Sequence, residues 1–172
     1  MSAGLILSLA RARGGTIVVE LAEIESPEPE ETIVHLRRVI LSLTGFALGQ
    51  GLDTGRSPEE VARELLAVFP SAEPALSSAS PEEVEHEARD FAAAMEMAHG
   101  NVVLVRDENV WTTRTTVAQD RTDLERWGAS IENWARFVVE QERRRAERMG
   151  IAVHGALQGD VFSMKFSHRG GP

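Results

Sequence analysis

Three side chains spaced four residues apart form the clearest group that could carry chemistry. Glu82, His86 and Asp90 would lie on one face of a helix. A histidine between carboxylates is typical of a helix-borne metal site or of an acid–base pair. This row is out of phase with the apolar residues of the same segment. We therefore expect a solvated acidic face without a metal, and the row is only a weak metal candidate.

A second group combines a threonine-rich strand, a histidine in a later strand and three tryptophans. Arg114 has two threonines on either side, and a guanidinium among hydroxyl groups suits an anionic ligand. The alternative is that threonines are good strand formers on a solvated face. If the strands are neighbours, a pocket between the sheet and a helix would be lined by Arg114, His154, Trp111, Trp127 and Trp134.

Other features of catalytic and cofactor sites are missing from the sequence. It has no cysteine and no tyrosine, which excludes thiol catalysis, thiolate metal sites and phenolic acids. No serine stands in a Gly-x-Ser-x-Gly motif. Residues 49–55 are glycine-rich but follow a predicted helix and lack the Lys-Ser/Thr of a phosphate loop, so they indicate a connecting loop. We predict no cofactor, and an enzyme is the less favoured class.

The charge distribution argues against nucleic acid as a partner. The 172 residues carry a net charge of −9, with −10 in residues 1–100 and +1 in residues 101–172. An acidic field repels phosphate backbones. The basic residues Arg143, Arg144, Arg145 and Arg148 suit the negative end of a helix dipole, and an anion site is the alternative.

The sequence also predicts a cytoplasmic protein without a membrane span. The absence of cysteine fits a reducing compartment. The N-terminal apolar run precedes its arginines, which is the wrong order for a secretory signal. The longest apolar helix candidate, residues 33–49, contains His35, Arg37 and Arg38 and is too short to cross a bilayer.

Helices are predicted over residues 30–48, 58–68 and 81–99, after a possible N-terminal hairpin of residues 5–9 and 16–24. Ser26, Ser57 and Ser80 each precede a Pro-Glu pair, and the last two also place a glutamate three residues on, as in a capping box. The first helix has a wide apolar face that consists of Ile33, Leu36, Val39, Ile40, Leu43, Phe46 and Ala47.

One long helix is predicted over residues 120–148. Its apolar seam has helical spacing, as expected of a helix laid on a core. Gly128 within it costs about 1 kcal/mol relative to alanine, which hints at a close approach or a break. The seam consists of Leu124, Trp127, Ile131, Trp134 and Val138.

Strands are predicted on both sides of this helix, over residues 101–105, 110–117, 151–157 and 161–167. Grouped helices and hairpins predict an α+β fold, with an antiparallel sheet covered on one side. We expect a single domain over residues 1–172, with a helical part at about 27–100 and a hairpin–helix–hairpin part at about 101–168.

Three functions remain open at this point. The favoured one is a non-enzymatic protein-interaction module, an adaptor or escort that binds a protein partner or itself as a homodimer. The second is a small-ligand sensor with its pocket between the sheet and the long helix. The third is a small enzyme that uses histidine and carboxylate groups for acid–base catalysis.

Overall fold

The computed structural model describes residues 4–7, 21–24, 29–68 and 78–169. The chain divides into two compact units, Met1–Leu36 and Arg37–Pro172. In the first unit, β1 (Gly4–Leu7) pairs antiparallel with β2 (Leu21–Ile24), as the sequence predicts for these segments. Helix α1 (Pro29–Asp53) begins in the first unit and ends in the second.

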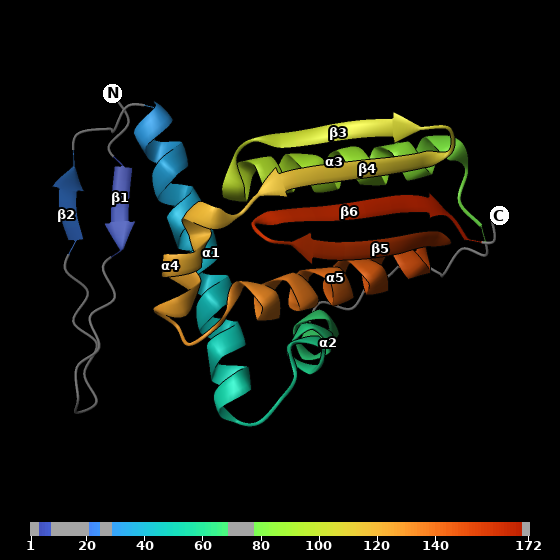
Figure 1. The fold of residues 1–172 in the computed structure, drawn as a ribbon. Helices are drawn as coiled ribbons and strands as arrows, with labels where there is room; N and C mark the ends of the chain where they lie inside the picture. The colour runs from blue at the N-terminus through green and yellow to red at the C-terminus, as the bar shows by residue number, and fades with distance from the viewer. Residues whose placement is uncertain (1–3, 8–20, 25–28, 69–77, 170–172) are drawn as a thin grey trace. The chain divides into compact units, whose positions relative to one another are not determined.

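The sheet of the second unit has four antiparallel strands (Figure 1). Their order across the sheet is β3 (Val102–Asp107), β4 (Val110–Thr116), β6 (Val161–His168) and β5 (Ile151–Gln158). Glu108 and Gly159 lie in the two hairpin turns with positive φ angles of 50° and 58°. The central strands β4 and β6 come from different hairpins, so the two hairpins join edge to edge. The predicted α+β class with an antiparallel sheet is confirmed.

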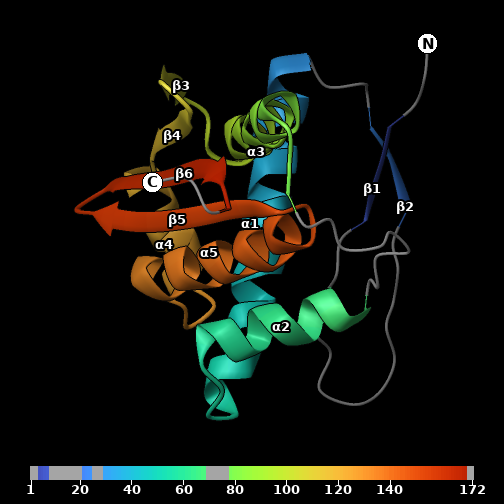
Figure 2. The ribbon, with the colours of Figure 1, turned by 90° about the vertical axis from the view of Figure 1, so that its right-hand side faces the viewer.

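Two helices, α3 (Pro81–His99) and α5 (Ile131–Arg148), cover one face of this sheet (Figure 2). Phe166 of β6 packs on Phe91 of α3 with ring centroids 5.4 Å apart, and Phe162 packs on Trp134 of α5 at 5.1 Å. Helix α5 approaches β5 at Gly155, where a Cβ atom would overlap a side chain of the helix. A third helix, α2 (Pro58–Val68), packs against α5.

The predicted long helix over residues 120–148 is wrong, because the chain breaks within it. A 3-10 turn (Ala118–Asp120) and the short helix α4 (Arg121–Glu125) precede the break, and α5 starts afresh. Gly128 has a φ angle of 78°, which a continuous helix does not allow. The Ser130 side chain then accepts a hydrogen bond from the backbone N–H of Asn133 and caps α5.

The predicted helix starts at Ser57 and Ser80 are confirmed. Each hydroxyl accepts a hydrogen bond from the N–H of the glutamate three residues on, and that carboxylate accepts one from the serine N–H. Ser26 lies outside the described residues. In the part of the chain that the structure describes, no helix is long and apolar enough to cross a membrane.

Candidate functional site

Helix α1 turns four large apolar side chains outward. Val39, Ile40, Leu43 and Phe46 are 36–63% exposed. Between Arg38 and Asp53 the helix has no charged residue, which is unusual for a solvent-facing surface. These four side chains belong to the wide apolar face that the sequence predicts, and the structure leaves them exposed. Leu41, Leu48 and the helix glycines are the buried positions.

The glycines explain this orientation. Gly49 and Gly51 belong to α1 and not to the predicted connecting loop. A Cβ at position 49 would overlap the carbonyl oxygen of Trp127, and one at position 51 would overlap Val61 of α2. Gly49 and Gly51 therefore allow close packing on two different sides of α1, which larger residues would prevent.

Trp127 extends the exposed apolar surface. Its ring packs edge-on against Phe46, with centroids 5.4 Å apart, and it remains 39% exposed. Its carbonyl fits against Gly49, which fixes the turn before α5 on the side of α1. The resulting surface, called the α1 face below, consists of Val39, Ile40, Leu43, Phe46 and Trp127.

A polar contact holds α1 in place beside this surface. The Arg37 guanidinium donates hydrogen bonds to the carbonyl oxygens of Met97, at 3.0 Å, and Glu96, at 3.1 Å. These carbonyls lie in the last turn of α3, where the Glu96 oxygen also accepts a hydrogen bond from the N–H of Gly100, at 2.8 Å. The α1 face is thus presented on a helix that is tied to the core at both ends of the exposed run.

Arg114 and His154, two of the predicted ligand-binding residues, share one face of the sheet. Both are exposed and alternate with inward residues, so they point away from α3 and α5. β6 lies between their strands. This surface is called the open face. Its outward positions include Val103, Val105, Asp107, Thr112, Arg114, His154, Ala156, Val161, Ser163 and Lys165.

The three tryptophans lie elsewhere, so the structure does not bring the five predicted residues into one pocket. Trp111 points to the covered face, where the guanidinium carbons of Arg89 and Arg106 each lie 5.4 Å from its ring centroid. Trp134 is buried in the core. Trp127 belongs to the α1 face. The pocket predicted between these residues is wrong in its lining.

A different hollow of about 420 Å³ lies where α2 and α5 meet β5. Leu157, Val139 and Phe162 form its apolar lining. At its edge, Arg136 of α5 forms two hydrogen bonds with Glu59 of α2, at 2.8 and 2.9 Å. Its volume is in the range of small-ligand sites. Of the five predicted ligand-binding residues, none lines it.

The structure does not arrange Glu82, His86 and Asp90 as three ligands of one metal ion. His86 Nε2 lies 3.4 Å from a carboxylate oxygen of Asp90, and both side chains are more than half exposed. Glu82 is exposed as well. Among the residues that the structure describes, no three histidine, aspartate or glutamate side chains converge as metal ligands do.

Two glutamates that the sequence analysis missed are buried between α3 and α5. Glu87 of α3 is 2% exposed, and Arg145 of α5 forms ion pairs with both Glu87 and Glu142. Burial, together with a hydrogen bond and charge repulsion from Glu142, raises the pKa of Glu87 to about 8, although Arg145 opposes the shift. The Arg145 guanidinium thus pairs with two carboxyl groups, and the Glu87 carboxyl retains its proton at neutral pH.

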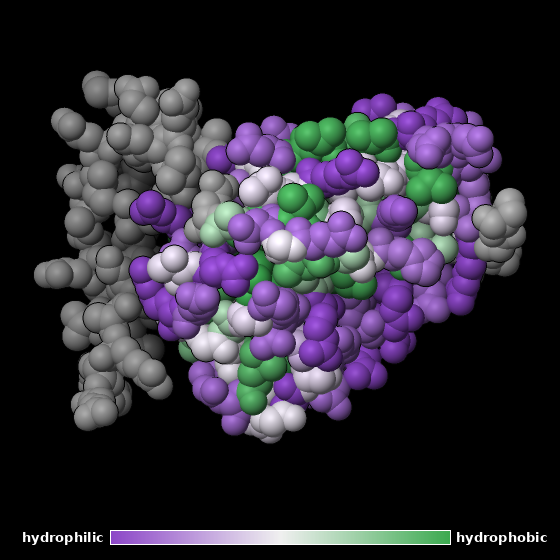
Figure 3. All heavy atoms as spheres, viewed as in Figure 1, coloured by the Kyte–Doolittle hydropathy of each residue, from purple (hydrophilic) through white to green (hydrophobic). Residues whose placement is uncertain are grey.

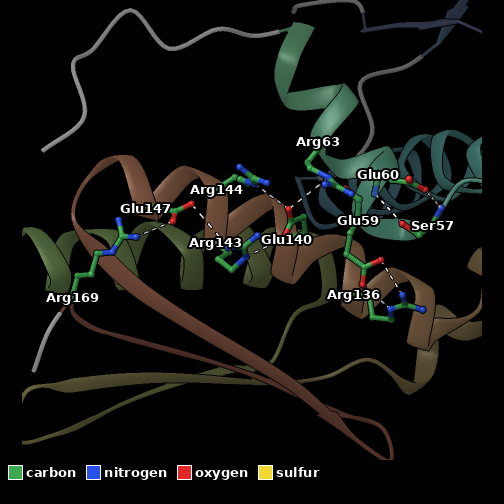
Figure 4. Close-up of polar contacts among 10 residues, drawn as sticks. All are labelled: Ser57, Glu59, Glu60, Arg63, Arg136, Glu140, Arg143, Arg144, Glu147 and Arg169. Atoms are coloured by element: carbon green, nitrogen blue, oxygen red, sulfur yellow. Dashed lines mark hydrogen bonds and ion pairs between the residues drawn. The ribbon is translucent and has the colours of Figure 1, made fainter. Parts of the chain in front are cut away.

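The pKa of the neighbouring Glu140 is shifted in the opposite direction, and Figure 4 shows the arginines around its carboxylate. Arg143 and Arg144 donate to its carboxylate at 2.7–3.0 Å, and Arg63 of α2 lies 3.9 Å away. Burial raises the pKa of Glu140, but the arginine hydrogen bonds outweigh it, and the net shift is downward. Three of the four arginines at the end of α5, Arg143, Arg144 and Arg145, therefore pair with carboxylates of the chain itself, which neither alternative predicted.

His99 and Asp120 form another buried polar pair. His99 Nδ1 lies 2.6 Å from Asp120 Oδ2, and the histidine ring packs edge-on against Trp134. A carboxylate that orients a histidine is also a feature of catalytic triads. Here the pair lies in the core, at 2% and 4% exposure, where it joins the end of α3 to the turn before α4.

A simple pattern would have revealed the buried glutamates. Val84, Glu87, Ala88 and Phe91 have the spacing of one helical face, so Glu87 interrupts an apolar seam. A carboxylate in that phase indicates a paired or protonated group. The outward orientation of α1 has a weaker signal, namely Gly45 and Gly49, which lie four residues apart on the side roughly opposite Leu43.

Comparisons with known proteins do not assign this chain to a family. No protein-family model matches the chain, and no curated protein matches it. The functional argument therefore depends on the surfaces and sites of the described residues.

Proposed function

We propose that this protein is a non-enzymatic interaction module that works as a homodimer, with two copies joined through the α1 face. The observation that supports the proposal is the exposure of four large apolar side chains along a charge-free stretch of helix. Exposed apolar patches with polar surroundings are typical of protein-interaction sites. The proposal places the module in the cytoplasm, a location that a cysteine-free chain suits.

A second copy is the partner that the charges favour. Two molecules of net charge −9 repel each other over most of their surfaces. The α1 face has no charge, so a twofold contact there avoids like-charge pairs. An antiparallel arrangement would also bring Arg38 of each copy towards the Asp53 end of the other helix, which gives opposite charges at the rim.

The size of the surface suggests moderate affinity. Its five side chains expose on the order of 400 Å² of apolar area, comparable to the largest patch on many monomers. Two copies would bury about 800 Å² from these side chains alone, and the rim would bring the total near the roughly 1,000 Å² of a specific interface. We therefore expect a reversible dimer with a dissociation constant near the micromolar range.

Sedimentation velocity over a range of concentrations tests the proposal. Leu43→Glu places a charge at the most exposed apolar position of the face, where each copy would bury an unpaired carboxylate. We expect this variant to weaken the dimer by about 100-fold or more, since a buried unpaired charge costs several kcal/mol. Val103→Glu is the matched control, because Val103 is similarly exposed on the open face.

Two results would contradict the proposal. One is a wild-type protein that stays monomeric at high concentration. The other is a dimer that Leu43→Glu leaves intact while Val103→Glu disrupts it, which would assign the contact to the sheet.

A further inference from the structure

The open face has a charge opposite to that of the whole protein. Arg114 and Lys165, which is the only lysine of the chain, both lie on it. Lys165 is directly opposite His154 on β5 and Thr112 on β4. Arg114 is two residues further along β4 than Thr112, and such diagonal neighbours lie about 7–8 Å apart. The two fixed charges and the histidine therefore form one basic group at the centre of the sheet.

These basic side chains have no structural role that explains them. Within the described residues, neither Arg114 nor Lys165 forms a hydrogen bond or an ion pair, whereas the arginines at the end of α5 pair with glutamates. The outward positions of β4, β5 and β6 carry no carboxylate, and β3 carries one, Asp107, at the end of the strand opposite Val110. Two like charges at this separation repel each other, so the fold gains nothing from their placement.

Apolar side chains flank the basic group. Val103 and Val105 of β3 are 57% and 45% exposed, and Val161 of β6 is 42% exposed. In Figure 3, which views the open face, hydrophobic atoms gather over β3, with hydrophilic side chains beside them. The face thus offers both an apolar strip and positive charge to one ligand.

We propose that the open face binds an acidic, amphipathic segment of a partner protein. Apolar side chains of the segment would rest on Val103 and Val105, and its carboxylates would reach Arg114 and Lys165. Charge complementarity supports this occupant, because an acidic segment meets its counter-charges at this face and is repelled by the remaining surface. The inference goes beyond the dimer proposal and uses a separate surface.

The same features disfavour a nucleic acid as the occupant. Single strands are bound largely by stacking of bases on exposed aromatic rings. The aromatic residues of the sheet, Trp111, Phe162 and Phe166, are buried on the covered face. Two fixed positive charges on a molecule of net charge −9 also give weak attraction for a phosphate backbone.

Fluorescence anisotropy tests the inference with a labelled short peptide in which glutamate alternates with leucine. We expect saturable binding that salt weakens, and a loss of at least about tenfold in affinity for Arg114→Glu and for Lys165→Glu. Arg148→Glu is the matched control, because Arg148 is exposed on α5 and the substitution makes the same change in net charge. It should alter the affinity by no more than about twofold.

Two further variants measure the apolar contribution to peptide binding and separate this test from the dimer proposal. Val103→Thr keeps the β-branched shape and should weaken binding of the glutamate–leucine peptide more than that of a glutamate–serine peptide. Leu43→Glu should bind the peptide as well as the wild type does, so failure of the dimer proposal leaves this test intact.

Three outcomes would overturn the inference. The first is no saturable binding of the glutamate–leucine peptide. The second is an equal loss of affinity for Arg148→Glu, which would indicate a net-charge effect. The third is tighter binding of an oligothymidylate than of the peptide, with sensitivity to Arg114→Glu, which would identify a nucleic-acid surface.

Discussion

The α1 face differs from the contact between α3 and α5 that contains Glu87, Glu142 and Arg145, which is called the seam below. Each region departs from the usual rule that apolar groups are buried and charged groups are exposed. The α1 face exposes large apolar side chains, whereas the seam buries the carboxyl groups of Glu87 and Glu142. Within the seam, the cost of burying these carboxyl groups is offset because Arg145 pairs with both of them and Glu87 retains its proton. The α1 face has no such compensation within the described residues. The difference suggests that the seam serves the fold and that the α1 face serves association.

The two regions also differ in how their helices pack. Between α3 and α5, long side chains fill the gap and form ion pairs. The buried side of α1 instead relies on small residues, and Trp127 and Val61 fit against its glycines. Packing directly against a helix backbone tolerates little change in volume. Substitutions at the α1 glycines should therefore destabilise the protein more than substitutions in the seam.

The largest expected effect is at Gly49. Gly49→Ala should lower the free energy of unfolding by about 3 kcal/mol, because the new methyl group must displace the Trp127 carbonyl. This loss should exceed the gain of about 1 kcal/mol that alanine brings to a helix interior. Chemical denaturation followed by tryptophan fluorescence measures the change.

Gly45→Ala is the control for this prediction. Its Cβ would lie 3.1 Å from the Trp127 side chain, which can shift, and not against a backbone group. We expect a change of less than about 1 kcal/mol, since the helix propensity gain offsets the crowding. Equal losses for the two variants would mean that the glycine side of α1 is not closely packed at Gly49.

The second effect concerns the pH dependence that the seam confers. The pKa of Glu87 rises from 4.5 to about 8 on folding, so the folded state holds a proton that the unfolded state has lost. This contribution to stability is fully present below about pH 4.5 and is lost as the pH rises through about 8. We expect the free energy of unfolding to fall by on the order of 2–3 kcal/mol between about pH 6 and pH 8.5.

Glu87→Gln should remove most of this dependence, because the amide keeps the shape of the protonated carboxyl without an ionisable group. Denaturation curves at several pH values measure the slope for both proteins. Glu140 provides an internal contrast, since its pKa shifts downward and its contribution is lost only on the acid side. A wild-type slope that Glu87→Gln leaves unchanged would show that another group titrates.

The fold was largely predictable from local signals. The caps at Ser57 and Ser80 and the hairpins around the sheet follow from residue types at short spacing, and they appear as predicted. Gly128 hinted at a close approach or a break, but one long helix was predicted across it because the apolar seam continues on both sides. A seam reports which residues are buried and does not report whether the backbone stays helical between them.

The candidate sites were harder to predict because they depend on how the elements meet. Arg114 and His154 do share a face, since both alternate outward on strands next to β6. The tryptophans could not be placed, because an aromatic ring packs wherever the tertiary contacts leave space. For α1, the sequence showed a wide apolar face but not which side would be buried, and the close approach of Trp127 and Val61 shows why the glycines are buried.

The smallest expected effect is at Leu43, and it tests whether the α1 face serves association and not the fold of a single copy. In dilute solution, where the monomer predominates, Leu43→Ala should change the free energy of unfolding by less than about 0.5 kcal/mol, because the side chain is 63% exposed. Leu48→Ala, on the buried side of the same helix, should cost about 3 kcal/mol. Denaturation at low protein concentration compares the two variants. A large loss for Leu43→Ala would mean that Leu43 already packs within one chain, and the α1 face would then no longer be available to a second copy.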